Sequence, residues 1–256
     1  MSTLRICGLL LVLALAVSAF AAYPTLSGPS GQAVIPTAMT AGPGFTVAAD
    51  YHNVGEGSAI PIRVLFGLGE NLEFGAMYTV IDDADIVGLS LDSAWGVNAK
   101  FAFAELFGGK AAIGGQYITA PFTLGLTDYD GTVTQAYLAW TRPFVFGEDA
   151  TQSLGLTVGA NWTQIDPEVI DTLDDIRYFA GLDLMLSERI SVLADYQTRS
   201  SDLADARGLS AVTARIALTQ MINLQFGTTN AFGPIAGDDH NFFAGLSLGF
   251  GGASAE

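Results

Sequence analysis

The chain has 256 residues and a formal net charge of −16, yet only 14% of its residues are charged. This acidic balance excludes a nucleic-acid-binding protein, which needs a basic surface. Beyond the N-terminus, no stretch approaches the roughly 18 consecutive apolar residues of a membrane-spanning helix, so a helical inner-membrane protein is excluded as well.

Residues 1–21 read as a secretory signal peptide. Arg5 gives a weak positive start, 9–17 form an apolar run, and Ala19-Phe20-Ala21 fits the cleavage pattern. The alternative, an N-terminal membrane anchor, would need a longer apolar run. The only cysteine, Cys7, precedes that run, on the wrong side for lipoprotein cleavage. We therefore expect an exported chain that uses no disulfides for its stability.

Residues 22–43 form an uncharged segment rich in Pro, Gly, Ser and Thr. This composition predicts neither a helix nor a strand. Two placements are open: an extended periplasmic leader, or a plug that tucks into the following domain and narrows it.

From residue 44 to residue 250 one pattern repeats, in which apolar residues alternate with small or polar ones. Successive side chains of a strand point to opposite faces, so each run has an apolar face and a polar face. Runs of this length, separated by turn residues, are typical of a transmembrane β-barrel. We expect a single all-β domain, a closed antiparallel barrel of about twelve strands. Their ranges are 44–53, 59–68, 71–81, 93–104, 110–120, 132–144, 152–164, 176–186, 189–198, 209–219, 222–230 and 240–250.

The direction of the apolar face follows from the charges. Charged residues recur on the polar face, often with opposite sign on neighbouring strands. In a dry core each unpaired charge would cost several kcal/mol, whereas a watery lumen with partners tolerates them. The polar face should therefore point inward. The candidate pore-lining residues are Asp50, Arg63, Glu73, Lys100, Arg177, Asp183, Asp195 and Arg215. Two roles are open for them: a salt-bridge network that braces the barrel, or a lining that selects solutes by charge.

Glycines and aromatic residues support the same orientation. Many glycines, such as Gly181 and Gly245, fall on the polar face, where small residues leave room in a lumen. Aromatic residues such as Tyr51, Trp95 and Trp162 lie near strand ends on the apolar face, as in the girdles at membrane interfaces. Tyr137 is expected to point inward instead.

The connections alternate in length, being short after even strands and mostly longer after odd strands, at 82–92, 121–131, 165–175, 199–208 and 231–239. This alternation is typical of barrels with short periplasmic turns and longer external loops. The longer loops are acidic, with Asp128 and Asp130 in one and Asp166 to Asp175 in another. Two readings are open: solvation of the outer rim, or binding of divalent cations, for which the spacing of a calcium loop is missing.

The stretch Ser27-Gly28-Pro29-Ser30-Gly31-Gln32-Ala33-Val34-Ile35-Pro36-Thr37-Ala38, followed by Pro43-Gly44 and a first strand, resembles the opening of YjbH-type outer-membrane barrels. That family is associated with exopolysaccharide production or export, so the resemblance implies a Gram-negative outer-membrane barrel and a role with glycans. The chain departs from the family in being shorter. More generally, it resembles small porin-like barrels.

The two histidines allow a catalytic alternative. His52 ends the first predicted strand and His240 begins the last, and these strands must pair to close a barrel. A Ser/His/Asp site with Ser58, or a metal site with Asp50, is conceivable there, but no nucleophile motif accompanies it. We therefore expect no enzyme and no cofactor.

The last six residues, 251–256, extend past Phe250 as a periplasmic tail, whereas such barrels often finish on an aromatic residue read by the insertion machinery. The sequence thus predicts a protein of the cell outer membrane whose partners are its lipids and the barrel-insertion machinery. Its expected function is passage of small polar solutes, or a step in glycan export, through a charge-lined lumen. The alternatives are a structural or adhesion barrel acting through its acidic loops, and a lipid-modifying enzyme.

Overall fold

The computed structural model describes residues 24–26, 28–54, 57–82, 89–91, 93–124, 126–146, 152–166, 168, 171–199, 208–231 and 240–250. The predicted signal peptide and the predicted tail lie outside these residues. Among the residues described, no helix is long and apolar enough to cross a membrane.

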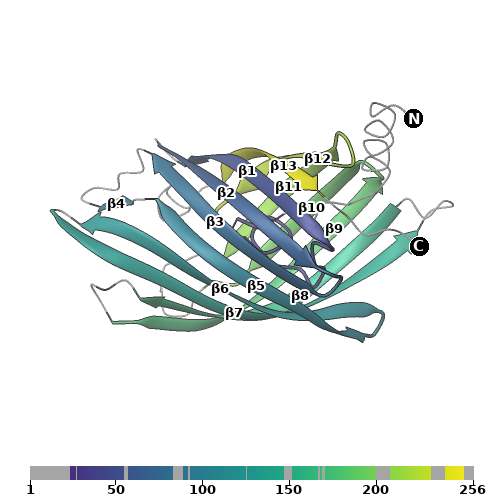
Figure 1. Ribbon diagram of the computed structural model, residues 1–256, viewed down its shortest axis with the longest axis horizontal. Helices are drawn as coiled ribbons and strands as arrows, with labels where there is room; N and C mark the ends of the chain where they lie inside the picture. Colours follow the sequence, from purple (N-terminus) through teal and green to yellow (C-terminus); the bar gives the residue numbers. More distant parts are fainter. Residues whose placement is uncertain are drawn as a thin grey trace, which may run out of the picture.

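The described residues form thirteen strands, whose arrangement is drawn in Figure 1. They are β1 (Gly44–Val54), β2 (Gly57–Leu68), β3 (Leu72–Asp82), β4 (Leu89–Leu91), β5 (Ala94–Leu106), β6 (Gly109–Leu124), β7 (Thr127–Phe146), β8 (Gln152–Asp166), β9 (Leu173–Ser187), β10 (Ile190–Gln197), β11 (Leu209–Ala217), β12 (Ile222–Thr229) and β13 (Asn241–Phe250). All of them except β4 correspond to a predicted strand.

Twelve strands pair antiparallel with their neighbours in chain order, and β1 pairs with β13, which closes the barrel. The closing register runs from Phe45 opposite Phe250 to His52 opposite Phe243. The rings of Phe45 and Phe250 stack with centroids 4.6 Å apart, so the seam is reinforced by an aromatic pair. Closure leaves none of the twelve strands as a free edge.

The two ends of the barrel differ. Turns at 69–71, 107–108, 188–189 and 218–221 lie at the end where β1 begins and β13 finishes, which we call the short-turn end. The opposite end, which we call the long-loop end, carries the connections after β3, β8, β10 and β12. The predicted alternation of loop lengths is thus present at these connections.

Two sequence-based boundaries were wrong. The predicted loop 121–131 is mostly strand, because β6 and β7 continue as a hairpin. The Phe122 and Tyr129 rings stack at 5.5 Å, the Thr123 hydroxyl donates to Asp128 at 2.8 Å, and β4, from another predicted loop, adds a third strand. Likewise, β8 and β9 extend through Asp166, Asp174 and Asp175, which had been assigned to an acidic loop.

The apolar faces of the strands point outward and the polar faces point inward, as predicted. On β5, Phe101 is 47% exposed, whereas the neighbouring Lys100 is 1% exposed. The predicted girdle residues Tyr51, Trp95 and Trp162 are also exposed on the outside, and Tyr137 is buried on the inside. This apolar exterior is suited to lipid and not to water.

Candidate functional site in the barrel lumen

The segment 24–43, which we call the lumen segment, lies against the inward faces of the strands. It folds back on itself through bridges between Pro24 and Ser30 and between Gly31 and Pro36. The Leu26 amide donates to the Ala33 carbonyl at 2.9 Å. Thr25, Ser30, Gln32, Ile35 and Ala38 are all at most 1% exposed. Of the two placements that the sequence left open, the described residues occupy the one inside the barrel.

A first ion pair holds the start of the lumen segment. Asp50 of β1 and Arg63 of β2 form a fully buried ion pair on adjacent strands. Arg63 also donates to the carbonyl oxygens of Pro24, at 3.4 Å, and Thr25, at 3.1 Å. On the other side of β1, Gln225 of β12 donates to Asp50 at 3.0 Å. One buried cation thus links the barrel wall to the backbone of the segment.

A second ion pair binds the middle of the segment. Glu73 of β3 and Lys100 of β5 are register partners, their charged atoms are 3.1 Å apart, and both side chains are fully buried. Glu73 accepts hydrogen bonds from the Ser30 amide at 2.8 Å, the Ser30 hydroxyl at 2.6 Å and the Ala41 amide at 2.9 Å. Lys100 donates to the carbonyls of Ser30 at 3.0 Å and Met39 at 2.6 Å. Each charge of the pair therefore binds the backbone of the segment as well as its partner.

The far wall of the barrel completes the attachment. The Val34 amide donates to Asp195 of β10 at 2.9 Å, and Arg215 of β11 donates to the Gly31 carbonyl at 3.0 Å. The Ala38 amide donates to the hydroxyl of Thr141 on β7 at 2.9 Å. The segment is thus bound from several sides of the barrel.

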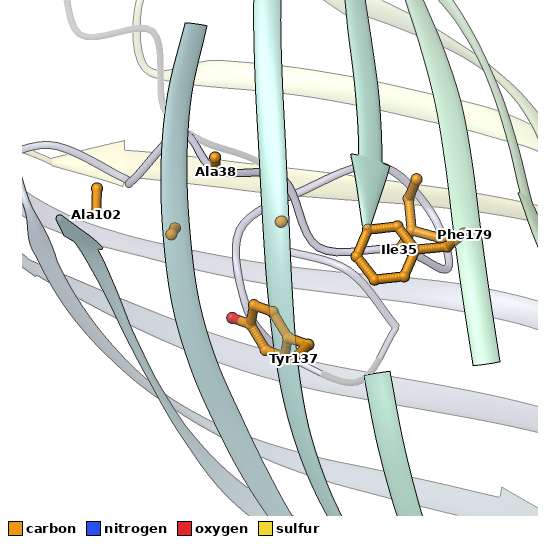
Figure 2. Packing of buried hydrophobic residues seen from close by; sticks show 7 residues of the cluster. Ile35, Ala38, Ala102, Tyr137 and Phe179 are labelled. Carbon is orange, nitrogen blue, oxygen red and sulfur yellow. The ribbon is translucent and has the colours of Figure 1, made fainter. Parts of the chain in front are cut away.

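Apolar contacts add to these polar ones. Ile35 and Ala38 pack in one buried cluster with Tyr137 of β7 and Phe179 of β9, and with Ala102, Ala112 and Ala139. Figure 2 shows Ile35 beside Phe179, with the Tyr137 ring lying along the loop of the segment. Tyr137 and Phe179 each face a glycine on the neighbouring strand, at Gly114 and Gly159.

Two inward glycines fit tightly against polar side chains. A Cβ atom at Gly181 would lie 2.0 Å from Oε1 of Gln32 in the lumen segment, and one at Gly245 would lie 1.6 Å from Oδ1 of Asp50. The room that the sequence predicted for glycines on the polar face is therefore occupied at these two positions.

In the described part of the chain, two cavities adjoin the segment. One, of about 310 Å³, lies toward the short-turn end and is lined by Ser30 and Met39 of the segment and by Asp183, Arg189 and Arg215. The other, of about 170 Å³, lies toward the long-loop end and is lined by Pro29 and Pro36 of the segment together with Gln116, Tyr137 and Asn161. The lumen segment lies between them.

All eight predicted pore-lining residues face inward, but their surroundings differ. Arg63, Glu73, Lys100, Asp195 and Arg215 contact the lumen segment, and Asp50 supports Arg63. Arg177 instead lies 3.9 Å from Asp175 on its own strand, and Asp183 lines the larger cavity. That these residues line a path for solutes stays a prediction.

Sequence reasoning missed several residues of the lumen. Ser30, Val34 and Ala38 bind the wall mainly through backbone groups, which leave no trace in the side-chain pattern. Thr141 and the amides Gln116 and Gln135 lie on polar faces that were identified, but they carry no charge to single them out. The inward alternation on β6 and β7 was the signal that could have located them.

The two histidines have separate surroundings. His52 is fully buried and its ring stacks on Phe243 at 4.9 Å, whereas His240 lies 2.9 Å from the Ser210 hydroxyl. Within the described ranges, no group of three or more His, Cys, Asp or Glu side chains could hold a metal ion. Several residues of the predicted acidic loops, including Asp83, Asp202 and Asp238, lie outside those ranges.

Comparisons with known proteins bear on the fold. Neither protein-family models nor curated protein sequences gave a match. Among solved structures, the chain is similar to the KdgM porin, with a TM-score of 0.57 at 7% identity over 80% of this chain and 99% of that one. A KdgM porin in complex with disordered oligogalacturonate gives 0.54 at 6% identity, over 80% and 99%. The NanC porin gives 0.50 at 9% identity, covering 81% and 99%. At such identities the likeness establishes a shared barrel fold.

Proposed function

We propose that this protein is a channel-forming barrel of the outer membrane, through which small polar solutes pass beside the lumen segment. The observation that carries the proposal is the polar lumen with a cavity on each side of that segment. An interior of this kind supports a role in passage, whereas a barrel with only a mechanical role could be filled with apolar side chains. The girdled apolar exterior supports placement in a membrane.

The solved neighbours support the same class of function. The KdgM and NanC proteins are porins, and one KdgM structure is a complex with oligogalacturonate. Together with the resemblance of 27–38 to YjbH-type barrels, this supports a saccharide or glycan as the solute class. The outer-membrane lipids and the insertion machinery would be the partners of such a barrel, with the long-loop end outside the cell.

The lumen segment would set the width of the path. Its attachment through two buried ion pairs and several backbone hydrogen bonds keeps it in place, so solutes have to pass around it or displace it. The channel should therefore be narrow in the intact protein and wider without the segment.

Conductance in planar bilayers tests the proposal. We expect small current steps from the intact protein and larger steps after deletion of 24–43, while removal of 251–256, the control truncation, changes nothing. Arg63→Ala should shift the ion selectivity toward cations, because Asp50 would lose its positive partner. If neither the intact protein nor the deletion variant conducts, the channel is refuted and a structural or adhesion barrel takes its place.

A further inference from the structure

The cavity toward the long-loop end differs from the other cavity in its chemistry. Its lining consists of carboxamide, tyrosine and apolar side chains, and no charged side chain of the described residues takes part. The cavity toward the short-turn end, by contrast, is lined by Asp183, Glu188, Arg189 and Arg215. We call the uncharged cavity the amide cavity.

Four carboxamides come together around it in two pairs. Gln116 of β6 donates to its register partner Gln135 of β7 at 2.5 Å. Asn161 of β8 donates to Gln197 of β10 at 3.2 Å, reaching past β9. Gln116, Gln135 and Asn161 are set by the inward alternation of three long strands, and Gln197 is the last residue of β10, so all four belong to the barrel wall.

Three polar atoms of this wall have no hydrogen-bond partner among the described residues: Oε1 of Gln116, Oδ1 of Asn161 and the hydroxyl of Tyr137. Gln116 is 7% exposed, and Asn161 and Tyr137 are each 4% exposed. Buried polar groups in native proteins are nearly always satisfied, so three unsatisfied ones in one wall favour a polar partner, for which the adjoining cavity has room. Rotating an amide by 180° only exchanges an acceptor for a donor, so the cavity stays polar in either orientation.

The other side of the cavity is apolar. Leu26, Pro29, Val34 and Pro36 of the lumen segment face the carboxamides across it. A sugar or polyol presents both kinds of surface, hydroxyl groups that hydrogen-bond to amides and C–H groups that pack on proline rings. An inward cation, Arg177, is the register partner of Asn161, but it lies outside the cavity lining and beside the carboxylate of Asp175. A carboxylate or phosphate would therefore lose its water here without a cation in the lining, which disfavours an acidic solute.

We propose that the amide cavity is a binding site for an uncharged, hydroxyl-rich solute, such as a neutral monosaccharide unit, between the lumen segment and the long-loop end. The site rests on the proposed function, because it supplies the specificity of the same path. The proposal predicts that this chain binds neutral saccharides and not acidic ones. The carboxamides would then select the solute, a role that the sequence analysis had suggested for the charged residues.

The test compares galactose with galacturonate, which differ in a carboxylate. Saturation-transfer NMR on the full-length folded protein in detergent measures binding, and single-channel recording measures block of the current. We expect binding and block by galactose, and at least about tenfold weaker effects of galacturonate. Gln116→Leu and Asn161→Leu should each weaken galactose binding about tenfold, since each removes hydrogen bonds to the solute. Gln164→Leu, on the outward face of β8, is the matched control and should bind as the unaltered protein does.

The two readouts separate the site from the channel. Binding without conductance, lost in Gln116→Leu and kept in Gln164→Leu, would refute the channel and retain the site. Conductance without galactose binding would refute the site and leave water as the occupant of the cavity. Equal binding of galactose and galacturonate, or equal losses in all three variants, would also overturn the proposal. Heat-dependent gel mobility of each variant confirms that the barrel is folded.

Discussion

Replacing Glu73 by alanine should release the lumen segment while the barrel stays closed. The carboxylate of Glu73 accepts three hydrogen bonds from the segment, at 2.6 to 2.9 Å, and pairs with Lys100 at 3.1 Å. Removing one partner of a buried ion pair typically costs about 3–5 kcal/mol, because the other charge is left uncompensated. At the lower bound, the equilibrium between the docked and released segment shifts about 100-fold.

Hydrogen–deuterium exchange followed by mass spectrometry measures this shift in the peptides that cover the lumen segment. In Glu73→Ala their amides should exchange about 100-fold faster, since exchange reports local opening, and the strands should keep their protection. Glu105→Ala, which alters an exposed carboxylate on β5, is the control and should leave exchange unchanged.

A double substitution sharpens the test. In Glu73→Ala with Lys100→Met no buried charge remains unpaired, so the double variant should lose less protection than the sum of the two single variants. Unchanged exchange in Glu73→Ala, or strict additivity in the double variant, would refute the view that this ion pair holds the segment.

Three further predictions follow from the packing. Gly181→Val should push Gln32 away from the wall, because a Cβ atom there would lie 2.0 Å from its side-chain oxygen, and protease cleavage within the segment should increase. Gly245→Ala should displace Asp50 and lower the midpoint temperature of unfolding, measured by heat-dependent gel mobility. Tyr137→Ala should cost about 3–5 kcal/mol in urea-induced unfolding, as for other large buried aromatic residues.

Matched controls exist for these variants. Gly155→Val is the control for Gly181, and Gly155→Ala for Gly245, since a Cβ atom at Gly155 would meet its nearest neighbour only at 3.4 Å. Equal effects at Gly155 would contradict the steric argument. Phe144→Ala is the control for Tyr137→Ala, because it removes an aromatic ring from the outer face of β7. If both variants lose the same free energy of unfolding, packing inside the barrel adds no stability beyond that of an exposed ring.

The strands and their orientation could be predicted from the sequence because the alternation is a local property with a strong physical cause. Lys100 could not lie on the same face as Phe101 in any strand, and its burial at 1% is possible only with Glu73 beside it. The hairpin of β6 and β7 was missed because Pro121, Asp128 and Asp130 are typical turn residues, yet ring stacking and a third strand hold them in strands.

The place of the lumen segment could not be predicted for a different reason. Its amides and carbonyls bind charges that are far away in the sequence, as Val34 binds Asp195 and Gly31 binds Arg215. Backbone groups are the same in every residue, so no pattern in 22–43 encodes these contacts. The sequence analysis predicted the inward charges but considered only other charged residues as their partners, and not backbone groups.

The wide sequence span of these contacts has a consequence for how the barrel assembles. Val34 and Asp195 are separated by 161 positions, and Gly31 and Arg215 by 184, so this part of the docking surface does not exist until β10 and β11 have joined the sheet. The segment precedes β1 in the sequence, yet these partners lie on β10 and β11, near the other end of the barrel sequence. A chain trapped before closure would therefore lack the contacts of Gly31 and Val34 with the far wall, which makes complete docking of the segment a reporter of completed folding.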